Sequence, residues 1–530
     1  MVFRIACVGG GPGGLFFATL IKQADPAVDV TVFERNDPDD VFGFGVVFSD
    51  ATLANIHAAD PVLREALAEH GRHWDDIEVR LKGERIRCGG NGMAAIHRRT
   101  LLGLLRARAV AVGVDLRFGT EVRPGELPGY DLVVAADGAN SRFRAELAET
   151  LESRVDVASA KFIWFGTDYM FDGLTFVHER GPHGVFAVHG YPVSADVSTF
   201  IVETDEPTWR AAGLDAFDTA APPGVSDEVS RAYLEELFAP RIDGCRLLVN
   251  NSRWAGFRTW RAARWYAGNV ALLGDAVHTA HFSVGSGTKM AMEDAVALAE
   301  SLAAHPGDLE TALAAYQAAR KPSVDRIQAS ARPSLAWWEH FGRYHDAFDP
   351  LPFAFHFLSR SIGRAKLARR DPAFVDEVER DWHARHGAAP LETPLKTGPY
   401  GFTGRRVTVR ETPEGPVAAG DGGGARVPLR GPDDDPDGAH GLWLAAPDDA
   451  SGLPAARARL DAAVGHGPPP LVAVHSGTAF TRVRLAEEAR LGHGVPALIV
   501  EDAPDDDRAA TLLMSGRADL VGARSPERHA

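Results

Sequence analysis

The stretch "RIACVGGGPGGLFFATLIKQADPAVDVTVFERN", Arg4–Asn36, decides the fold of the first part of this 530-residue chain. An apolar run leads into the pattern Gly9-x-Gly11-x-x-Gly14, a helical pattern follows, and a second apolar run ends at Glu34. In such a unit the first glycine permits a tight turn, the second lets a pyrophosphate approach the backbone, and the third allows close helix packing. An acid at the end of the second strand accepts hydrogen bonds from ribose hydroxyls. The stretch therefore predicts a dinucleotide site, and Glu34 favours FAD or NAD over NADP.

Two later stretches also place an acid where an apolar run ends. In "YDLVVAADGANSRFR", Tyr130–Arg144, a predicted buried strand leads into Asp137. In "NVALLGDAVHTAHFSVGSGTKMAMEDAVALAESL", Asn269–Leu302, the apolar run meets Asp275, and glycines and a helix follow. Because ligands of parallel sheets bind beyond the carboxyl ends of the strands, we expect the three strand ends to converge on one crevice. The alternatives are a β-turn residue for Asp137 and a turn or helix-cap carboxylate for Asp275.

The composition is that of an ordinary globular protein, with 45% hydrophobic and 24% charged residues. A formal net charge of −16 without a basic tract argues against nucleic acid or an anionic membrane surface as a partner. Cys7, Cys88 and Cys245 form no CxxC pair, so neither a disulfide framework nor a metal site is predicted. No signal-peptide pattern precedes the first strand, and no apolar run reaches the roughly 18 residues of a membrane span. We expect a cytoplasmic protein that binds small molecules.

Together, the three motifs resemble those of the FAD-dependent aromatic hydroxylases, the group A flavoprotein monooxygenases, over roughly residues 1 to 390. Within that group, segments such as "FGFGVVFSD" and "HTAHFSVGSGTKMAMEDA" are most similar to salicylyl-CoA 5-hydroxylases and 2-aminobenzoyl-CoA monooxygenases. The violacein-pathway hydroxylase VioD is a related branch. The resemblance implies an α/β protein with a Rossmann-like FAD-binding domain of the GR2, para-hydroxybenzoate-hydroxylase type, a mixed-sheet substrate domain and a C-terminal α/β extension.

The predicted domains are interleaved along the chain. The FAD-binding domain takes residues 1–75, 96–155 and 256–335, and the substrate-binding domain takes residues 76–95 and 156–255. The second of these has alternating patterns typical of strands, and we expect most of its aromatic side chains in the core: Trp164, Phe165, Phe176, Phe186 and Tyr191. A helical segment over 336–395 and the extension over 396–530 follow.

The extension is similar at both ends to the old yellow enzyme barrel that follows the hydroxylase in bifunctional aminobenzoyl-CoA proteins. A TIM barrel typically has about 250 residues, so we expect a shrunken remnant that binds no FMN. A thioredoxin-like tail is the alternative. The stretch "AAGDGGGARVPLRGPDDDPDGAHG", Ala418–Gly441, is predicted to be loop or linker and not a second nucleotide site, because no strand precedes it.

The resemblance implies FAD contacts at all three strand ends. Arg98 matches a position that contacts the FAD phosphates, Asp275 one that binds the ribityl chain, and Asp137 lies near the pyrophosphate. A solvated helix arginine is the alternative for Arg98, and Arg99 beside it is easily confused with it. The backbone of 285–288 opens a helix whose partial positive charge would stabilise the reduced flavin. The full set of expected cofactor contacts is Gly9, Gly11, Gly13, Gly14, Glu34, Arg35, Gly45, Val46, Arg98, Asp137, Asp275, Gly285, Ser286, Gly287 and Thr288.

Two further segments are expected beside the flavin. A loop over 44–47 would present small backbone groups to it at Gly45, with an apolar strand that contains a bulge as the alternative. His281 stands where many relatives carry proline, and as a catalytic residue it would hydrogen-bond the substrate phenol or the hydroperoxide and shuttle a proton. The alternative is a packing histidine, which is what we expect for His278.

The implied reaction is hydroxylation of an aromatic substrate with O2 and NADPH or NADH through a C4a-hydroperoxyflavin. The expected substrate is an aryl-CoA or another aryl thioester, such as one on a carrier protein, and a free polycyclic or indolic metabolite is the alternative. A disulfide-reductase type of flavoprotein needs a second GxGxxG and a dithiol, which the sequence lacks. A catalytically silent flavin-binding module stays open, as does the choice between monomer and homodimer.

Overall fold

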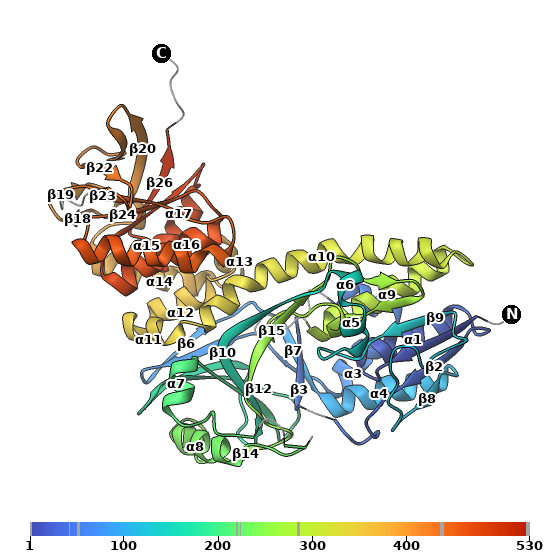
Figure 1. Ribbon diagram of the computed structural model, residues 1–530. Coiled ribbons are helices and arrows are strands. Elements are labelled where there is room, and N and C mark those ends of the chain that lie inside the picture. The colour runs from blue at the N-terminus through green and yellow to red at the C-terminus, as the bar shows by residue number, and fades with distance from the viewer. Residues whose placement is uncertain are drawn as a thin grey trace. The chain divides into compact units, whose positions relative to one another are not determined.

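The computed structural model describes residues 3–41, 43–49, 53–218, 221–222, 224–282, 287–434 and 439–525 (Figure 1). Two compact units divide the chain. The first comprises Met1–Arg87 and Asn91–Gly342, and the second comprises Cys88–Gly90 and Arg343–Ala530. The domain limits predicted at 335 and 395 stay predictions.

A six-stranded sheet in the first unit is formed around the Gly-rich stretch. β1 (Arg4–Val8) lies between β2 (Asp29–Phe33) and β9 (Leu132–Ala135), and β17 (Val270–Leu272) follows β9, all of them parallel. In register, Val8 pairs with both Phe33 and Ala135, and Ala135 pairs with Leu272. The four strands therefore end at one edge of the sheet, as predicted. The sheet is completed by β8 (Asp115–Arg117) and β16 (Tyr266–Ala267).

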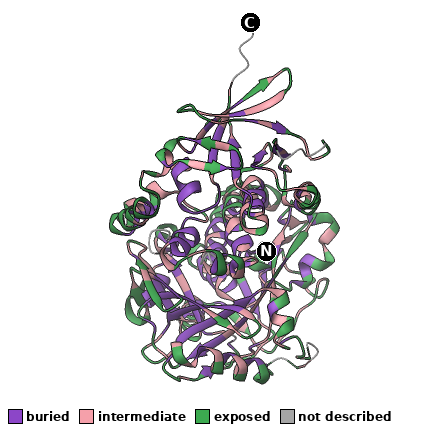
Figure 2. Ribbon diagram, turned by 90° about the vertical axis from the view of Figure 1, so that its left-hand side faces the viewer, coloured by how far each residue is buried: buried purple, intermediate pink, exposed green. Residues whose placement is uncertain are grey.

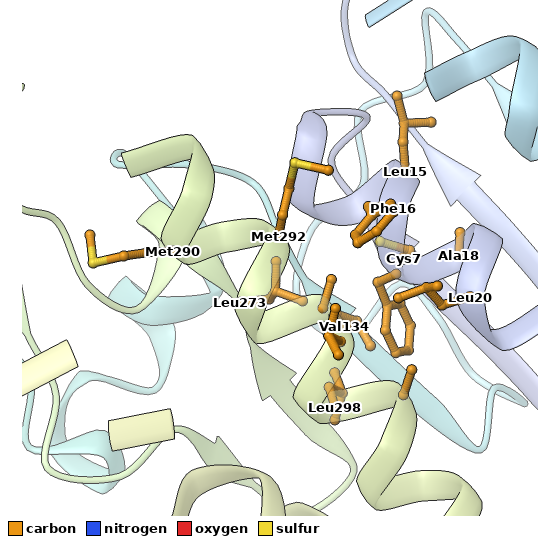
Figure 3. Close-up of a cluster of buried hydrophobic side chains, with 14 of the residues drawn as sticks. Cys7, Leu15, Phe16, Ala18, Leu20, Val134, Leu273, Met290, Met292 and Leu298 are labelled. Carbon is orange, nitrogen blue, oxygen red and sulfur yellow. The ribbon is translucent and has the colours of Figure 1, made fainter. Parts of the chain in front are cut away.

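Two helices carry the core of this sheet, α1 (Pro12–Ala24) and α9 (Gly287–Ala304). Proline suits the first turn of α1, where its missing N–H has no intrahelical partner to lose. Leu15 and Phe16 of α1 are fully buried and belong with Leu273 and Met292 to one hydrophobic cluster (Figure 3). Full burial of such a side chain contributes about 1.5–3 kcal/mol, so this cluster holds the Gly-rich turn in place.

The second sheet of this unit has eight strands in the order β14-β10-β13-β12-β11-β5-β6, with β15 also paired to β10. β5 pairs with β11 in parallel and the β10–β13, β13–β12 and β12–β11 pairs are antiparallel, so the predicted mixed sheet is confirmed. Its strands are β5 (Ile77–Leu81), β6 (Glu84–Cys88), β10 (Arg154–Thr167), β11 (Leu174–Gly181), β12 (Gly184–Pro192), β13 (Ser198–Thr204), β14 (Leu247–Leu248) and β15 (Ala255–Arg261).

The two faces of this sheet differ in chemistry because alternate residues of a strand point to opposite sides. One face is apolar and packs against α8 (Glu228–Phe238), with the buried side chains Ile163, Phe165, Phe186, Val188, Phe200 and Val202. The opposite face carries buried polar and aromatic groups, namely Phe176, His178, His189, Tyr191 and Glu203, together with the half-buried Trp164. The aromatic residues expected in the core therefore divide between the two faces.

A small antiparallel sheet joins β3 (Gly45–Ser49), β7 (Met93–His97) and β4 (Arg72–Trp74). The loop predicted over 44–47 is therefore wrong from Gly45 onward. The alternative, an apolar strand with a bulge, is correct as to the strand, but β3 pairs with β7 in continuous register and has no bulge there. A Cβ on Gly45 would lie 2.1 Å from Val193 Cγ1, so packing against neighbouring protein requires glycine there. The remaining helices of this unit are α2 (Ala54–Ala59), α3 (Val62–His70), α4 (Arg98–Ala111), α5 (Arg142–Glu146), α6 (Ala148–Leu151), α7 (Glu206–Ala211) and α10 (Leu309–Trp338).

The second unit contains a closed barrel of seven strands, β20-β21-β22-β23-β24-β25-β26. The pairs from β22 through β26, and β26 with β20, are parallel, whereas β21 pairs antiparallel with both neighbours. Closure confirms an α/β extension and excludes the alternative thioredoxin-like tail, which has an open sheet. The strands are β20 (Arg406–Thr412), β21 (Gly415–Gly420), β22 (Arg426–Arg430), β23 (Gly441–Ala445), β24 (Val472–His475), β25 (Ala497–Glu501) and β26 (Leu520–Arg524).

The stretch predicted as linker, Ala418–Gly441, contributes to three of these strands, namely the end of β21, all of β22 and the first residue of β23, so that prediction is wrong. Ala418, Val427 and Leu429 are buried in the barrel interior, and Figure 2 shows buried residues along the barrel strands. The many glycines of this stretch hide the alternating pattern of its short strands. These strands find their hydrogen-bonding partners only when the barrel closes. The helices of this part are α11 (Phe341–Ala347), α12 (Pro350–Leu358), α13 (Arg364–Arg370), α14 (Pro372–His386), α15 (Leu453–His466), α16 (Ala479–Glu487) and α17 (Asp506–Met514), beside a hairpin of β18 (Leu395–Thr397) and β19 (Tyr400–Phe402).

Candidate functional site

The Gly-rich turn after β1 packs against protein on its inner side and leaves space for a ligand on its outer side. Gly9 has φ +115°, and a Cβ there would lie 2.2 Å from the carbonyl oxygen of Ala136. A Cβ on Gly14 would lie 2.2 Å from the Gly9 oxygen, and one on Gly13 would also clash. By contrast, nothing lies within 4 Å of the Cβ position of Gly11. The open backbone and the positive end of the α1 dipole together form a site suited to phosphate groups.

Glu34, which directly follows β2, lies beside this turn. Its Oε2 accepts a hydrogen bond from the Gly10 N–H at 2.7 Å, and its Oε1 accepts from the backbone N–H and the side-chain amide of Asn36 at 2.9 and 2.8 Å. An ionised carboxylate has about four acceptor positions, so one remains for a ligand hydroxyl. Arg35 is exposed to solvent.

Asp275 and Arg98 form a pair of opposite charges at the same edge. Asp275 follows Gly274 in the turn after β17, and its side chain is solvent-exposed. The protein that packs around the other sides of this carboxyl displaces water from it and raises its pKa, and the charges of His278 and Arg98 offset only part of that rise. Arg98 begins α4, and burial lowers its pKa against the opposing effect of Asp275. Within the described part of the chain neither side chain has a hydrogen-bond partner, so both remain available to a ligand.

Asp137, at the end of β9, carries an unsatisfied acceptor. Its Oδ2 accepts from the Arg142 N–H at 2.8 Å, but its Oδ1 is buried and has no hydrogen-bond partner among the described residues. Leaving such an atom unpaired costs about 1–3 kcal/mol, which a ligand or water donor would recover. Arg144 ties this loop to the next one, because it donates to the Ala139 oxygen at 2.5 Å and to the Ala276 oxygen at 2.9 Å.

A buried ionic network holds the turn that carries Asp275. Asp294 of α9 is fully buried and accepts from the Gly274 N–H at 3.1 Å. It also bonds His278 Nε2 at 2.7 Å and Arg320 Nε at 2.9 Å. His278 is therefore part of the frame of the turn, which agrees with the structural role expected for it.

His281 belongs to a second buried network, which reaches into the eight-stranded sheet. Its Nε2 lies 3.0 Å from Glu203 Oε1, and His189 Nε2 lies 3.0 Å from Glu203 Oε2. Burial alone would raise the pKa of Glu203, but the charges and hydrogen bonds of His281 and His189 outweigh burial and bring that pKa to about 2. The carboxylate is thus ionised and shared by two imidazoles.

The start of α9 adjoins this group. A Cβ on Gly287 would lie 4.0 Å from Asp275 Oδ1, so the first turn of an 18-residue helix lies beside the carboxylate. Thr288 follows within that turn. Gly285 and Ser286, two of the predicted cofactor contacts, lie outside the described residues.

Over the ranges that the structure describes, no group of three or more His, Cys, Asp or Glu side chains could hold a metal ion. In the same ranges, no helix is both long and apolar enough to cross a membrane.

Comparison with known proteins decides the family. A family model for an FAD binding domain matches residues 130–331, which include Asp137 and Asp275. The chain is 61% identical to a salicyloyl-CoA 5-hydroxylase of a Streptomyces species, over 98% of this chain and 99% of that protein. The chain belongs to the FAD-dependent aromatic hydroxylases. This confirms the resemblance seen in its three motifs.

More distant relatives of the hydroxylase match a shorter part of it. It is 38% identical to a 3-hydroxy-4-methyl-anthranilyl-[aryl-carrier protein] 5-monooxygenase of Streptosporangium sibiricum, over 63% of this chain and 89% of that protein. It is 32% identical to a protodeoxyviolaceinate monooxygenase of Chromobacterium violaceum, again over 63% of this chain and 89% of that protein.

Solved structures support the fold of about two thirds of the chain. The structure of 2-methyl-3-hydroxypyridine-5-carboxylic acid oxygenase gives a TM-score of 0.52 at 22% identity, covering 68% of this chain and 99% of that one. The structure of P. aeruginosa PqsL with 2-aminobenzoylacetate gives 0.51 at 23%, covering 66% of this chain and all of that one.

The residues of the hydroxylase fit FAD, the cofactor of its family. An open peptide turn at a helix N-terminus suits the pyrophosphate, and carboxylates with spare acceptor positions suit the hydroxyls of ribose and the ribityl chain. The orphaned Oδ1 of Asp137, and the Asp275 and Arg98 side chains without a hydrogen-bond partner among the described residues, are groups that a polar ligand would satisfy.

Several residues that shape the site were not among the predicted contacts, namely Arg144, His189, Glu203, Asp294 and Arg320. Arg144 and Asp294 stand inside motifs singled out from the sequence, but nothing there says what they bond. The signal for His189 and Glu203 is a polar residue on the buried, period-two pattern of a strand, which the alternation of "GVFAVHGYP" and "STFIVET" contains.

Proposed function

We propose that this hydroxylase inserts one oxygen atom into the aromatic ring of an aryl-CoA thioester in the cytoplasm, with salicyloyl-CoA as the first candidate substrate. The observation that carries the proposal is the 61% identity to a salicyloyl-CoA 5-hydroxylase over 98% of this chain and 99% of that protein. Because that match includes the second unit, the whole architecture is shared and not the flavin module alone.

FAD would be held by the groups gathered at the edge of the six-stranded sheet. The turn from Gly9 to Gly14 and Arg98 would hold the phosphates, and Glu34 would bind the adenosine ribose. Asp275 would accept a hydrogen bond from the ribityl chain, and Asp137 would take one from a nearby hydroxyl or water. The segment that opens α9 would direct its positive end at the flavin. Gly13, Arg35, Gly45 and Val46 complete the proposed contacts.

Bound FAD supplies electron transfer from NAD(P)H and activation of O2. The chain's own part is to position the ring, exclude water and move a proton. Aromatic side chains at the polar face of the eight-stranded sheet would form the dry wall of the substrate site. They include Trp164 of β10 and Phe282 of the segment after Asp275, whose ring centroids lie 5.7 Å apart. His281 would bond the substrate hydroxyl and take its proton.

The test is NAD(P)H consumption by the purified holoenzyme with salicyloyl-CoA, 2-aminobenzoyl-CoA, benzoyl-CoA and free salicylate, with products identified by mass spectrometry. We expect stimulation and a hydroxylated thioester with salicyloyl-CoA, and no coupled product with free salicylate. Equal coupling with salicylate would show that the thioester is not recognised. FAD that is reduced but yields no product with any arene would support the silent flavin module.

A carrier-protein thioester is the second candidate, favoured by the 38% identity to an enzyme named for an aryl-carrier protein. The same assay with salicyl-pantetheine, salicyloyl-CoA and a salicyl-loaded carrier protein separates the two. A kcat/KM for the loaded carrier that exceeds that of the CoA thioester by tenfold or more would favour this candidate.

A further inference from the structure

The first turns of α9 touch two of the segments proposed to hold FAD. A Cβ on Gly13, at the start of α1, would lie 3.1 Å from Ala291 Cβ, and a Cβ on Gly274 would lie 2.8 Å from the same atom. A Cβ on Gly287 would lie 4.0 Å from Asp275 Oδ1. Because packing this close leaves no room for adjustment, the position of α9 fixes the distance between the Gly-rich turn and the turn after β17.

Four charged side chains lead from the first turn of α9 to the neighbouring helix α10 and back. Lys289 Nζ lies 2.7 Å from Glu293 Oε1, and Arg320 Nη2 lies 2.9 Å from Glu293 Oε2. Arg320 Nε lies 2.9 Å from Asp294 Oδ1, and the other oxygen of Asp294 accepts from the Gly274 N–H at 3.1 Å. We call Lys289, Glu293, Arg320 and Asp294 the α9 network. It joins the first turn of the helix to the turn after β17.

Lys289 stands where the helix itself disfavours a lysine. A cation in the first turn faces the positive end of the helix dipole. Its pair with Glu293 also has the lysine N-terminal to the glutamate, which is the less favourable order at i, i+4. Residues that break local rules in this way are expected at functional sites. The position of Lys289 therefore indicates a role other than the stability of α9.

The ion pairs of the network are largely withdrawn from water. The side chains of Lys289 and Glu293 are 14% and 13% exposed, and those of Arg320 and Asp294 are 10% and 0% exposed. Exposed ion pairs contribute little because water and salt screen them, whereas partly buried pairs are screened much less. Burial alone would lower the pKa of Arg320, but the charges of Asp294 and Glu293 outweigh burial and raise that pKa. The guanidinium is thus charged and shared by two carboxylates.

We propose that Lys289 and Glu293 are positioning residues for FAD, which hold the first turn of α9 at a fixed distance from the turn that carries Asp275. The inference rests on the proposed function, in which the opening of α9 and Asp275 contact the same cofactor. Arg320 anchors both carboxylates to α10, and Lys289 extends that anchorage to the residues beside Thr288. The helix end and the ribityl acceptor are therefore ordered before FAD binds, which lowers the cost of ordering them on binding.

The test measures FAD affinity, because the network acts on the cofactor and not on the arene. The holoenzyme is diluted serially, and the released flavin is followed by its fluorescence. Lys289→Met and Glu293→Gln should each weaken FAD binding about 10-fold, the low end of the loss seen at metal sites when a supporting residue is removed. Far-ultraviolet circular dichroism of the same samples should show wild-type secondary structure. Wild-type FAD affinity in either variant, or less folded protein with unchanged affinity in the remainder, would overturn the proposal.

The double variant separates positioning from direct contact. If Lys289 acts through Glu293, Lys289→Met/Glu293→Gln should bind FAD no more weakly than Glu293→Gln alone. Multiplied losses would show that the lysine contacts the cofactor itself, and would overturn the proposal. Lys289→Arg retains a charge for Glu293 and should recover most of the affinity, and no recovery would likewise count against it. Glu293→Gln keeps the shape of the side chain, so it carries the test if Lys289→Met fails to fold.

Lys321→Met is the matched control. Lys321 also pairs with an acid four residues later, since its Nζ lies 2.7 Å from Asp325 Oδ2, but this pair is on α10 and its side chains are 28% and 52% exposed. The control should leave FAD affinity unchanged, and an equal loss there would contradict a specific role of the α9 network.

Asp275→Asn shows which of the two proposals fails. If this variant binds FAD as tightly as wild type does, the proposed FAD contacts are wrong. Weakened binding in Asp275→Asn, with full affinity in Lys289→Met and Glu293→Gln, would instead overturn the role of the α9 network alone. No arene enters these measurements, so they stand even where the substrate assay goes against an aryl-CoA.

Discussion

In both units of the hydroxylase, polar side chains lie where parallel strands end. The polar side chains of the first unit lack hydrogen-bond partners that those of the second unit have. In the first unit, Asp275 after β17 and Arg98 at the start of α4 have no side-chain hydrogen-bond partner within the described residues, and Asp137 keeps a buried orphan oxygen. In the barrel of the second unit, His475 at the end of β24 bonds Arg524 at the end of β26 at 2.8 Å. Similar architecture thus carries polar groups that lack hydrogen-bond partners in the first unit, which we call the open region, and polar groups that bond each other in the second unit, which we call the closed region.

The comparison teaches that unsatisfied polar groups, and not strand ends as such, mark the site. The barrel groups also pack on each other: Trp443 stacks on His475 with ring centroids 3.9 Å apart, and Glu501 at the end of β25 bonds Arg508 at 3.0 Å. Relatives differ in the share of the chain that they match. Those at 38% and 32% identity cover 63% of this chain and 89% of their own length, whereas the 61% relative matches nearly the whole of it.

The largest effect is expected where the open region does chemistry, at His281. His281→Ala should retain FAD and its reduction by NAD(P)H, because the proposed contact is with neither the ribityl chain nor the phosphates. Oxygen transfer should fall by about 10²–10⁴-fold, the usual worth of general acid–base help, with more hydrogen peroxide released per NAD(P)H consumed. Product and peroxide are measured together.

The control for that variant is His183→Ala, which removes an exposed histidine from the turn between β11 and β12. It should change neither product nor peroxide. Loss of flavin from His281→Ala with unchanged coupling in the remainder, or no change at all, would make His281 a packing residue.

The closed region should instead respond in stability. Glu487 is buried, accepts from Tyr344 Oη at 2.8 Å, and is paired with Arg484 and, at 3.5 Å, with Arg517. Glu487→Ala leaves two buried guanidinium groups uncompensated, which should lower the free energy of unfolding of the second unit by about 3–5 kcal/mol. Calorimetry measures it. Glu414→Ala, in the exposed β20–β21 turn, should change the stability by about 0.5 kcal/mol at most, and an equal loss in both variants would contradict the role of the network.

Substitution of Asp275 should have the opposite effects: FAD affinity should fall, and the stability of the apoprotein should rise. Asp275→Ala removes one hydrogen bond to a charged group, worth about 1.5–3 kcal/mol, so FAD affinity should fall by roughly 10- to 100-fold. Flavin absorbance after gel filtration and titration of the apoprotein with FAD measure the loss. Asp275→Asn keeps an acceptor and should lose less, and full flavin in both variants would remove Asp275 from the site.

The ionised carboxylate of Asp275 should lower the free energy of unfolding of the apoprotein at neutral pH. Because the folded pKa of Asp275 is raised, the folded apoprotein binds its proton more tightly than the unfolded chain does, and stability falls as pH rises from the ordinary pKa to the raised one. Apo Asp275→Asn should therefore melt above wild-type apoprotein at pH 7, and the difference should vanish in acid. A lower melting temperature for the variant at pH 7 would show that the carboxylate is stabilised by its neighbours.

How much of the candidate site could be predicted from the sequence depends on how far apart in the chain the contacting residues stand. The turn at Gly9 and the ends at Asp137 and Asp275 were predictable, since each lies in a local strand-and-glycine pattern and parallel strands share an edge. The network of His189, Glu203 and His281 was not, because its members meet only once β12 and β13 pair and the segment after Asp275 folds back onto them. Its sequence signal is a polar residue on a buried strand face, without any indication of its partner.

The barrel shows the same limit from the other side. Its helices and parallel strands follow from alternating patterns, but β21 and β22 lie in a glycine-rich stretch that predicts a loop. A strand of that composition is stable only with partners on both sides, which barrel closure supplies. The loop predicted at Gly45 failed for a related reason, since its glycine is required by Val193 in a distant turn of the chain.

The smallest effect is expected at the barrel mouth, and it tests the comparison most sharply. Arg524 donates to His475 Nδ1, and the Ser476 hydroxyl also lies 2.8 Å from that nitrogen, so the imidazole is kept neutral. Burial, assisted by the charge of Arg524, lowers the pKa of His475 to about 4. Groups so engaged have little left for a phosphate. Arg524→Ala and His475→Ala should therefore leave FAD content and coupled hydroxylation within twofold, and the flavin released from wild type should be FAD alone, one per chain. FMN in a stoichiometric amount, or hydroxylation lowered tenfold with FAD intact, would show that the barrel mouth is a site after all, and that satisfied side chains can open to admit a ligand.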